Sequence, residues 1–393
     1  MDVVDSIRHG QHDRLRRASP EHPISANVRK NHEPQKPPRV ITSNATILSG
    51  FAIPLTPNLT HGYDPLYREM KDHSARIVVV CPEYPSPSGG VRKMYRHVDV
   101  LIANGIPAVI LHQQPGFRCQ WFESRTAVAY PGDAWPPAPS DILLVPELFI
   151  WQFIEQAPGT PKVVFNQNAY QTFRGHSIAH QTMPYGKPDC LASIVVSEDS
   201  RRYLEFAFAD HRVFRIHNSV NPALFCFQPD KKRRVAFMPR KNSSDAMQVI
   251  NLLNCRGKLR GYQLVPIEGK SELETAQTLR ESMIFLSFGF QEGWSMPSME
   301  AMACGCVTIG YDGRGGREFF DSRHAIVVEP QDVIGFADSV ETAISRLDDA
   351  DPQLCKMARD ASEFVLRTYT PQREEEDIVA TWRQILQILE VAR

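Results

Sequence analysis

The sequence predicts an α/β protein with two domains, each built around a parallel β-sheet. From about residue 76 onward, short β-branched runs alternate with amphipathic helical segments, a pattern typical of parallel sheets that helices cover on both faces. The chain has 393 residues, which is more than one hydrophobic core usually serves, so two domains are expected. Ligands of such sheets bind beyond the carboxyl ends of the strands.

The first domain is expected over residues 75–217. Its first strand is the run IVVVC at residues 77–81, which suits a strand buried on both faces. A loop with the adjacent glycines Gly89 and Gly90 follows this strand and leads into an amphipathic helix. Four further apolar runs predict strands at residues 108–111, 142–145, 162–165 and 193–196.

The second domain is expected over residues 218–370, where the chain leaves a polar, proline-bearing join at residues 217–234. Its first strand begins near Val235, and the other predicted strands cover residues 262–267, 283–286, 307–309 and 325–328. The predicted helices cover residues 244–255, 272–281 and 298–304, and two more begin at Val333 and Pro352. A last amphipathic helix is expected at residues 371–392.

Residues 1–74 are polar, rich in Pro, His and Arg, and only weakly periodic. This composition predicts a disordered extension, although residues 40–55 are apolar enough to pack on the folded body. The alternative is an electrostatic tether to anionic lipid, because arginines and lysines recur between Arg14 and Arg39. The N-terminal run MDVVDSIRHGQHDRLRR lacks an apolar core and a small-residue cleavage site, so no secretory signal is expected.

Charge and cysteine usage exclude some classes of function. The net charge is −1 with 23% charged residues, which argues against nucleic acid as a partner. No stretch approaches the ~18 consecutive apolar residues of a membrane-spanning helix. The eight cysteines lack paired metal-site spacing, so a reduced, cytoplasmic protein is expected, with peripheral contact at the inner membrane face as an alternative. Asp349 and Asp351 form a D-x-D pattern in a polar turn and are interpreted as surface, so no metal site is predicted.

The residues that carry chemistry are concentrated between residues 283 and 318. A short strand is followed by a polar loop with Glu292, and a helix with Pro297 in its first turn carries Glu300. Both carboxylates therefore face the crevice at the strand ends, where the free N–H groups of the helix N-terminus form an anion site. Carboxylates for hydroxyl groups and N–H groups for phosphate suit a ligand that is both a sugar and a diphosphate.

This stretch resembles the paired-glutamate motif of retaining, nucleotide-sugar-dependent glycosyltransferases with the GT-B fold. That group includes glycogen synthases, sucrose synthases and many bacterial mannosyl-, glucosyl- and rhamnosyltransferases. Their pattern reads E-G-[FWY]-G-x-P-x-x-E-A-M-A-x-G-x-P-V, followed by G-G-x-x-E. The chain matches this pattern at Glu292, Gly293, Trp294, Pro297, Glu300, Ala301, Met302, Ala303, Gly305, Val307, Gly315, Gly316 and Glu318. The join resembles the family's N-G-V-D-x-x-x-F linker at Asn218, Ser219, Val220, Asn221 and Phe225.

The resemblance implies two Rossmann-like domains that face a cleft, with the last helix, residues 371–393, completing the first domain. It implies transfer of a sugar, with retention of anomeric configuration, from a nucleotide-diphosphate donor to a glycan, lipid-linked or small-molecule acceptor. The nucleotide sugar is a substrate, so no cofactor is implied. No metal is needed if cationic side chains neutralise the diphosphate.

The resemblance also implies roles for individual residues. Arg240 and Lys241 resemble the arginine and lysine that grip the diphosphate, and together with Glu292 they form the implied catalytic set. Glu292 would accept hydrogen bonds from hydroxyls of the donor sugar, and Glu300 from the ribose of the nucleotide. The other implied donor contacts are Gly89 and Gly90, which match a P-x-x-G-G loop, and Gly293, Trp294, Ser295, Met296 and Pro297.

The chain departs from the family pattern beside this set. Ser295 stands where glycine is usual, and the family's lysine usually lies several residues beyond the position of Lys241. Many relatives carry a histidine after a later first-domain strand, whereas this chain reads NQN at residues 166–168. His176 and His180 lie downstream and are interpreted as structural or acceptor-side. Two alternatives share the fold: a nucleotide-sugar epimerase, and a non-catalytic scaffold subunit, which the missing histidine and Ser295 favour.

Overall fold

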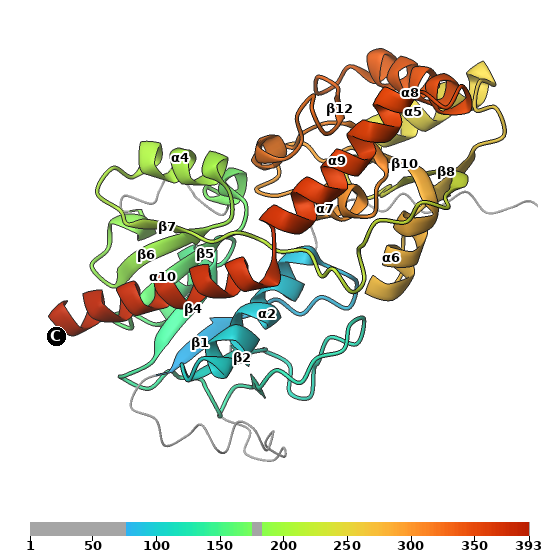
Figure 1. Cartoon of the computed structure of the whole chain (residues 1–393). Coiled ribbons are helices and arrows are strands. Elements are labelled where there is room, and N and C mark those ends of the chain that lie inside the picture. Colours follow the sequence, from blue (N-terminus) through green and yellow to red (C-terminus); the bar gives the residue numbers. More distant parts are fainter. Residues whose placement is uncertain (1–75, 175–182, 393) are drawn as a thin grey trace, which may run out of the picture. The chain divides into compact units, whose positions relative to one another are not determined.

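Two parallel β-sheets form the framework of the chain, and helices pack against both of them (Figure 1). The structure, a computed structural model, describes residues 76–174 and 183–392. The predictions for residues 1–74, for His176 and for His180 therefore lie outside the described residues. All of the described residues belong to one unit, Phe51–Arg393.

The first sheet has seven strands in the order β3-β2-β1-β4-β5-β6-β7, and all of its pairings are parallel. These strands are β1 (Ile77–Val80), β2 (Ala108–Leu111), β3 (Val128–Ala129), β4 (Ile142–Pro146), β5 (Lys162–Asn166), β6 (Cys190–Val195) and β7 (Val213–Arg215). The accompanying helices are α2 (Gly89–Ala103), α3 (Ile150–Gln156) and α4 (Glu198–Ala207), with the 3-10 turns η2 (Ala169–Gln171) and η3 (Pro184–Gly186).

The central strands of the first sheet agree with the sequence prediction. β2 begins and ends as predicted, whereas β6 begins at Cys190, ahead of the predicted start at residue 193. The edge strands β3 and β7 do not appear in the prediction, because runs of two or three residues show no readable alternation. The central strands are buried on both faces, which is why their sequences are continuous apolar runs.

The second sheet has five parallel strands in the order β12-β11-β10-β8-β9. These strands are β8 (Lys232–Phe237), β9 (Gln263–Pro266), β10 (Ser282–Ser287), β11 (Val307–Gly310) and β12 (Ile326–Val327). Its helices are α5 (Ser243–Arg256), α6 (Glu272–Glu281), α7 (Met296–Ala303), α8 (Val333–Asp348) and α9 (Pro352–Thr368), with the 3-10 turn η4 (Gly315–Glu318).

Two element boundaries of the second sheet correct the sequence prediction. β8 begins at Lys232, inside the basic run that the sequence assigns to the join; Lys232 stands at the exposed amino end of the strand and pairs with Glu281 at 2.8 Å. α7 begins at Met296 rather than at Ser298 and holds Pro297 in its first turn, where its missing N–H costs nothing.

The last helix, α10 (Pro371–Ala392), packs against α2 and β6 of the first sheet. The indole Nε1 of Trp382 donates a hydrogen bond to Nε2 of His97 in α2, at 2.6 Å. Both side chains are buried, and burial lowers the pKa of His97 to about 4, so its ring stays neutral and can accept this hydrogen bond. Within residues 76–174 and 183–392, no helix is long and apolar enough to cross a membrane.

Candidate functional site

A pocket of about 270 Å³ opens where the carboxyl ends of strands from both sheets meet. The loop after β1 and the loop after β5 line it from the first sheet, and the segments after β8 and β10 line it from the second. The predicted site residues that line this pocket are Gly89, Gly90, Arg240, Lys241, Glu292, Gly293, Trp294, Met296, Pro297 and Glu300. The structure therefore brings together nearly the whole set that the sequence singles out.

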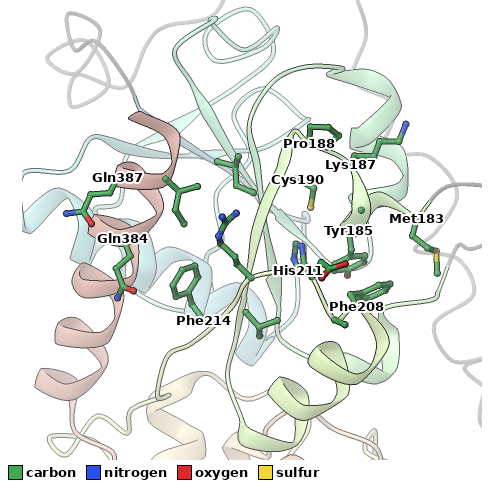
Figure 2. A pocket seen from close by; sticks show the side chains of 17 residues that line it. Met183, Tyr185, Lys187, Pro188, Cys190, Phe208, His211, Phe214, Gln384 and Gln387 are labelled. Carbon is green, nitrogen blue, oxygen red and sulfur yellow. The ribbon is translucent and has the colours of Figure 1, made fainter. Parts of the chain in front are cut away.

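A larger hollow of about 1080 Å³ lies elsewhere, at the amino ends of β6 and β7 and beside α10 (Figure 2). Figure 2 shows Tyr185 and Phe208 lying together in it, and their rings stack at 4.4 Å between centroids. Gln384 and Gln387 line it from α10. None of the site residues predicted from the sequence lines this hollow. We assign the site to the smaller pocket, because carboxylates and cations converge there at strand ends.

Lys241 and Glu292 form an ion pair at the centre of the pocket, in which the Nζ of Lys241 donates to Oε1 of Glu292. The backbone of Glu292 is held on both sides, since its N–H donates to the carbonyl of Gly313 at 2.8 Å and its carbonyl accepts from the N–H of Gly315 at 3.1 Å. The second carboxylate oxygen, Oε2, is buried and has no hydrogen-bond partner in the described part of the chain. This oxygen packs against Gly289, since a Cβ on that glycine would lie 2.4 Å from it.

Backbone strain is concentrated beside this ion pair. Asn242 follows Lys241 with φ 47°, Gln291 precedes Glu292 with φ 55°, and Arg314 forms an isolated bridge with Glu292 and has φ 74°. Non-glycine residues in this left-handed region cost about 1–3 kcal/mol each and persist where surrounding contacts hold them. The loops that present the ion pair are therefore held in one conformation by the packing around them.

Glu300 lies in α7 and lines the same pocket. Burial, together with the nearby charge of Glu272, raises the pKa of its carboxyl to about 8, although Lys93 acts in the opposite direction. A carboxyl with this pKa is mostly protonated at neutral pH and changes charge state in the pH range where ligands are measured.

Ser295 is the predicted contact that the structure places away from this pocket. Its side chain is buried, and its hydroxyl lies 2.8 Å from that of Ser298, which in turn donates to Ser287 at 2.9 Å. The added Cβ and hydroxyl therefore point into the protein, and the departure from glycine is accommodated by a chain of hydrogen bonds behind α7.

The loop after β5 carries polar side chains that reach two other loops of the pocket. The side-chain amide of Gln167 donates to the carbonyl of Gly90 at 3.2 Å, and that of Asn168 donates to the carbonyl of Gln291 at 3.0 Å. Asn166 instead points inward and donates to Thr172 at 2.8 Å. Where many relatives carry a histidine, this chain thus has two amides that link the loops around the pocket.

Sequence reasoning missed several residues of the pocket. Lys270, after β9, and Arg92 and Lys93, in α2, add positive charge to its wall, and Trp121 and Phe225 add apolar surface. The burial of Lys93 is the one signal that the sequence contained, since this lysine sits on the apolar face of an amphipathic helix. Lys270, Trp121 and Phe225 come from loops, where no periodic pattern marks them.

Metal ligands do not gather in the described part of the chain: no group of three or more His, Cys, Asp or Glu residues there is arranged to hold an ion. Asp351 caps α9 by accepting from the N–H of Gln353 at 2.8 Å, and it also pairs with Arg346 at 2.7 Å. The D-x-D pattern is therefore partly used in helix capping.

Comparison with known proteins finds similarity in the part of the chain that carries Glu292 and Glu300. Residues 255–380 match the family described as "Glycosyl transferase-like". The chain is 26% identical over 182 residues to an alpha-1,6-glucosyltransferase of Actinobacillus pleuropneumoniae serotype 7 (strain AP76). This match covers 44% of the chain and 53% of that protein, so the chain spans about half the length of this curated relative.

Solved structures of low sequence identity share the fold. A sucrose-phosphate synthase from Thermosynechococcus elongatus superimposes with a TM-score of 0.57 at 12% identity, over 80% of this chain and 100% of that one. HepE from Anabaena, in complex with UDP and glucose, gives a TM-score of 0.57 at 13% identity, over 79% of this chain and 100% of that one. The fold that the resemblance implies is thereby confirmed: the chain has the GT-B fold, and residues 255–380 are similar to the glycosyl transferase-like family.

Proposed function

We propose that the protein is a glycosyltransferase that transfers a sugar from a nucleoside-diphosphate donor to an acceptor hydroxyl. The glycosyl transferase-like domain and the GT-B fold support this proposal. The observation that carries it is the pocket, which Glu292 and Glu300 line together with Arg240 and Lys241. UDP is the first donor nucleotide to test, since the neighbouring structure of HepE is described with UDP and glucose.

The cationic side chains of the pocket would neutralise the leaving diphosphate. Charge develops on the leaving oxygen during transfer, and preorganised cations are the strongest way to stabilise it. Lys241 already lies against Glu292, and Arg240, Arg92 and Lys270 line the same pocket. Each charge-assisted hydrogen bond of this kind contributes about 1.5–3 kcal/mol, so these side chains can replace a divalent metal in the proposed reaction.

The carboxylates of the pocket would orient the hydroxyl groups of the donor. Glu292 lines the pocket beside Lys241, and its carboxylate would accept a hydrogen bond from a sugar hydroxyl. Glu300, further along α7, would accept from the ribose. This division of roles supports a donor that lies along the N-terminus of α7 with its diphosphate near Arg240 and Lys241.

We further propose that transfer proceeds with retention, and that the acceptor is a glycan, a lipid-linked sugar or a small molecule. The resemblance to retaining enzymes supports the stereochemistry. Trp121, Gln167 and Asn168 line the pocket from the first sheet, and an acceptor would lie on this side, because most of the donor contacts come from the second sheet.

A thermal-shift screen against UDP, GDP, dTDP, ADP and their sugar conjugates tests the donor site. A ligand at ~100 times its dissociation constant stabilises the folded state by about 2.7 kcal/mol, which raises the melting temperature measurably. We expect one of these nucleotides to raise the melting temperature. The nucleotide sugar with the same base should then be consumed when a cell extract that contains acceptors is added.

Variants separate the proposal from its alternatives. Lys241→Ala should abolish most of the nucleotide-induced rise in melting temperature and most of the sugar transfer. The control Lys258→Ala, which removes a 59%-exposed lysine outside the pocket, should leave both intact. Conversion of the nucleotide sugar with no acceptor present would indicate an epimerase. A protein that binds no nucleotide and transfers no sugar would contradict the proposal and favour a scaffold.

A further inference from the structure

A buried carboxylate that does not line the pocket forms hydrogen bonds with the backbone of the loop after β5. Glu147 follows directly after β4 and is 5% exposed. Its Oε1 accepts from the backbone N–H of Asn168 at 3.0 Å, and its Oε2 accepts from the backbone N–H of Gln167 at 3.2 Å. Glu147 does not line the pocket itself, so any effect on chemistry there must pass through these two amides.

The two residues that Glu147 holds are in contact with the donor loops of the second sheet. The carbonyl oxygen of Gln167 lies so close to Gly293 that a Cβ on that glycine would be 1.9 Å away from it. The side chain of Asn168 donates to the carbonyl of Gln291, the residue before Glu292. The position of the backbone at Gln167 and Asn168 therefore limits the positions that the loop around Glu292 can adopt.

We propose that Glu147 is a positioning residue for the transfer reaction: its carboxylate anchors the backbone of Gln167 and Asn168, and this segment sets the distance between the Gly89–Gly90 loop and the Glu292 loop. The inference rests on the proposed function and adds a residue that does not touch the substrate. Gln167 completes the link on the first-sheet side, because its side chain holds the carbonyl of Gly90 at 3.2 Å.

A carboxylate suits this task better than another side chain of the same length. Two N–H groups point at one side chain, and a carboxylate offers an acceptor oxygen to each of them. An amide would have to turn its own NH₂ group toward one of these N–H groups, which leaves a buried donor without a partner. Burial raises the pKa of Glu147 to about 7, even though its hydrogen bonds from the backbone, including those of Gln167 and Asn168, favour the ionised form.

The test compares Glu147→Gln with wild type in two separate measurements: the dissociation constant for UDP, and kcat for sugar transfer from the matching UDP-sugar. If UDP is not the nucleotide that shifts the melting temperature, the nucleotide found in the screen replaces it in both. The matched control is Glu155→Gln, which changes an exposed glutamate on α3. Glu147→Asp serves as a second variant, since it keeps both oxygens on a shorter side chain.

We expect Glu147→Gln to lower kcat at least about tenfold, because displacements of about 1 Å can cost that much or more. The dissociation constant of the nucleotide should stay within about threefold, since the donor contacts on α7 are not attached to Glu147. Hydrogen exchange at the amides of Gln167 and Asn168 should become faster in the variant. Glu147→Asp should recover part of kcat, and Glu155→Gln should match wild type.

Three results would overturn the inference. One is a kcat of Glu147→Gln equal to that of wild type. Another is a parallel loss of kcat and nucleotide affinity together with a lower melting temperature in both Glu147 variants, which would mean that Glu147 only supports the fold. The third is a wild-type protein that binds nucleotide but transfers no sugar, and this result alone would also defeat the proposed function.

Discussion

Lys93 and Glu374 form a buried ion pair between residues that are 281 positions apart in the sequence, with 2.6 Å between Nζ and Oε1. Lys93 belongs to α2, and Glu374 lies in the first turn of α10. The hydroxyl of Ser219 donates to the other carboxylate oxygen of Glu374 at 2.6 Å, and the backbone carbonyl of Ser219 accepts from Lys93 at 3.0 Å. One hydrogen-bonded cluster thus ties together α2, the join between the sheets and α10.

Removal of one member of this ion pair should destabilise the protein strongly. Glu374→Ala leaves the Lys93 ammonium buried without its counter-charge. We expect the free energy of unfolding to fall by about 3–5 kcal/mol, as is typical when one partner of a buried ion pair is removed. The double variant Lys93→Met with Glu374→Leu should regain most of this loss. Urea unfolding measures both effects. The control is Asp360→Ala, which breaks an exposed pair with Lys356 and should cost less than about 1 kcal/mol.

Gly293 should not tolerate a side chain. In Gly293→Ala the new Cβ would stand 1.9 Å from the carbonyl oxygen of Gln167, a backbone atom that cannot move aside cheaply. We expect loss of nucleotide-induced stabilisation and of transfer, because the loop after β5 and the loop that carries Glu292 and Gly293 must separate. Gly186→Ala is the matched control, since nothing lies within 4 Å of its Cβ position. If nucleotide raised the melting temperature of Gly293→Ala as much as that of Gly186→Ala, the close contact between Gly293 and Gln167 would be contradicted.

Nucleotide affinity should rise with pH through the titration of Glu300. Burial raises the pKa of this carboxyl to about 8 in the free protein, so below that pH it is protonated and has one acceptor oxygen fewer for the ribose. We expect the dissociation constant to fall between pH 7 and pH 9, as measured by calorimetry, and Glu300→Gln to remove this dependence. A wild-type affinity that is constant over this range would rule out the assignment.

The same carboxyl should affect stability with the opposite trend. Its pKa in the folded state lies above the ordinary value of 4.5, so the folded state binds more protons than the unfolded state between these two values. The free energy of unfolding therefore decreases as the pH rises from about 4.5 to about 8. Glu300→Gln should melt at a higher temperature than wild type at pH 9 and show little difference at pH 5.

Glu318, the last glutamate of the motif, should contribute to stability through the first sheet. Its Oε1 accepts from the N–H of Glu198 at the start of α4 at 2.7 Å, and its Oε2 pairs with Arg215 at the end of β7. Glu318→Ala should lower the free energy of unfolding by about 1–3 kcal/mol, and Glu318→Gln by less, because its amide oxygen still accepts from Glu198. The exposed Glu329 provides the control, and a loss in Glu329→Ala equal to that in Glu318→Ala would refute the prediction.

The sequence was sufficient for the central strands of both sheets and for bringing Glu292 and Glu300 to one crevice of the second sheet. Parallel strands buried on both faces are continuous apolar runs, so the central strands of both sheets can be read directly. Glu292 and Glu300 could be placed in one crevice because a strand, a loop and a helix that follow one another in sequence fix their positions locally. The edge strands β3 and β7 were too short to carry such a signal.

Tertiary structure alone decided which first-sheet groups meet this half-site. Glu147 holds the amides of Gln167 and Asn168, and Gln167 meets Gly293, although these partners are 20 or more positions apart in sequence and no local pattern relates them. The ion pair of Lys93 with Glu374 likewise depends on where α10 returns to α2. Local propensity and periodicity describe neighbours along the chain, whereas these contacts arise from the packing of whole elements against one another, which sets their distances only in the folded protein.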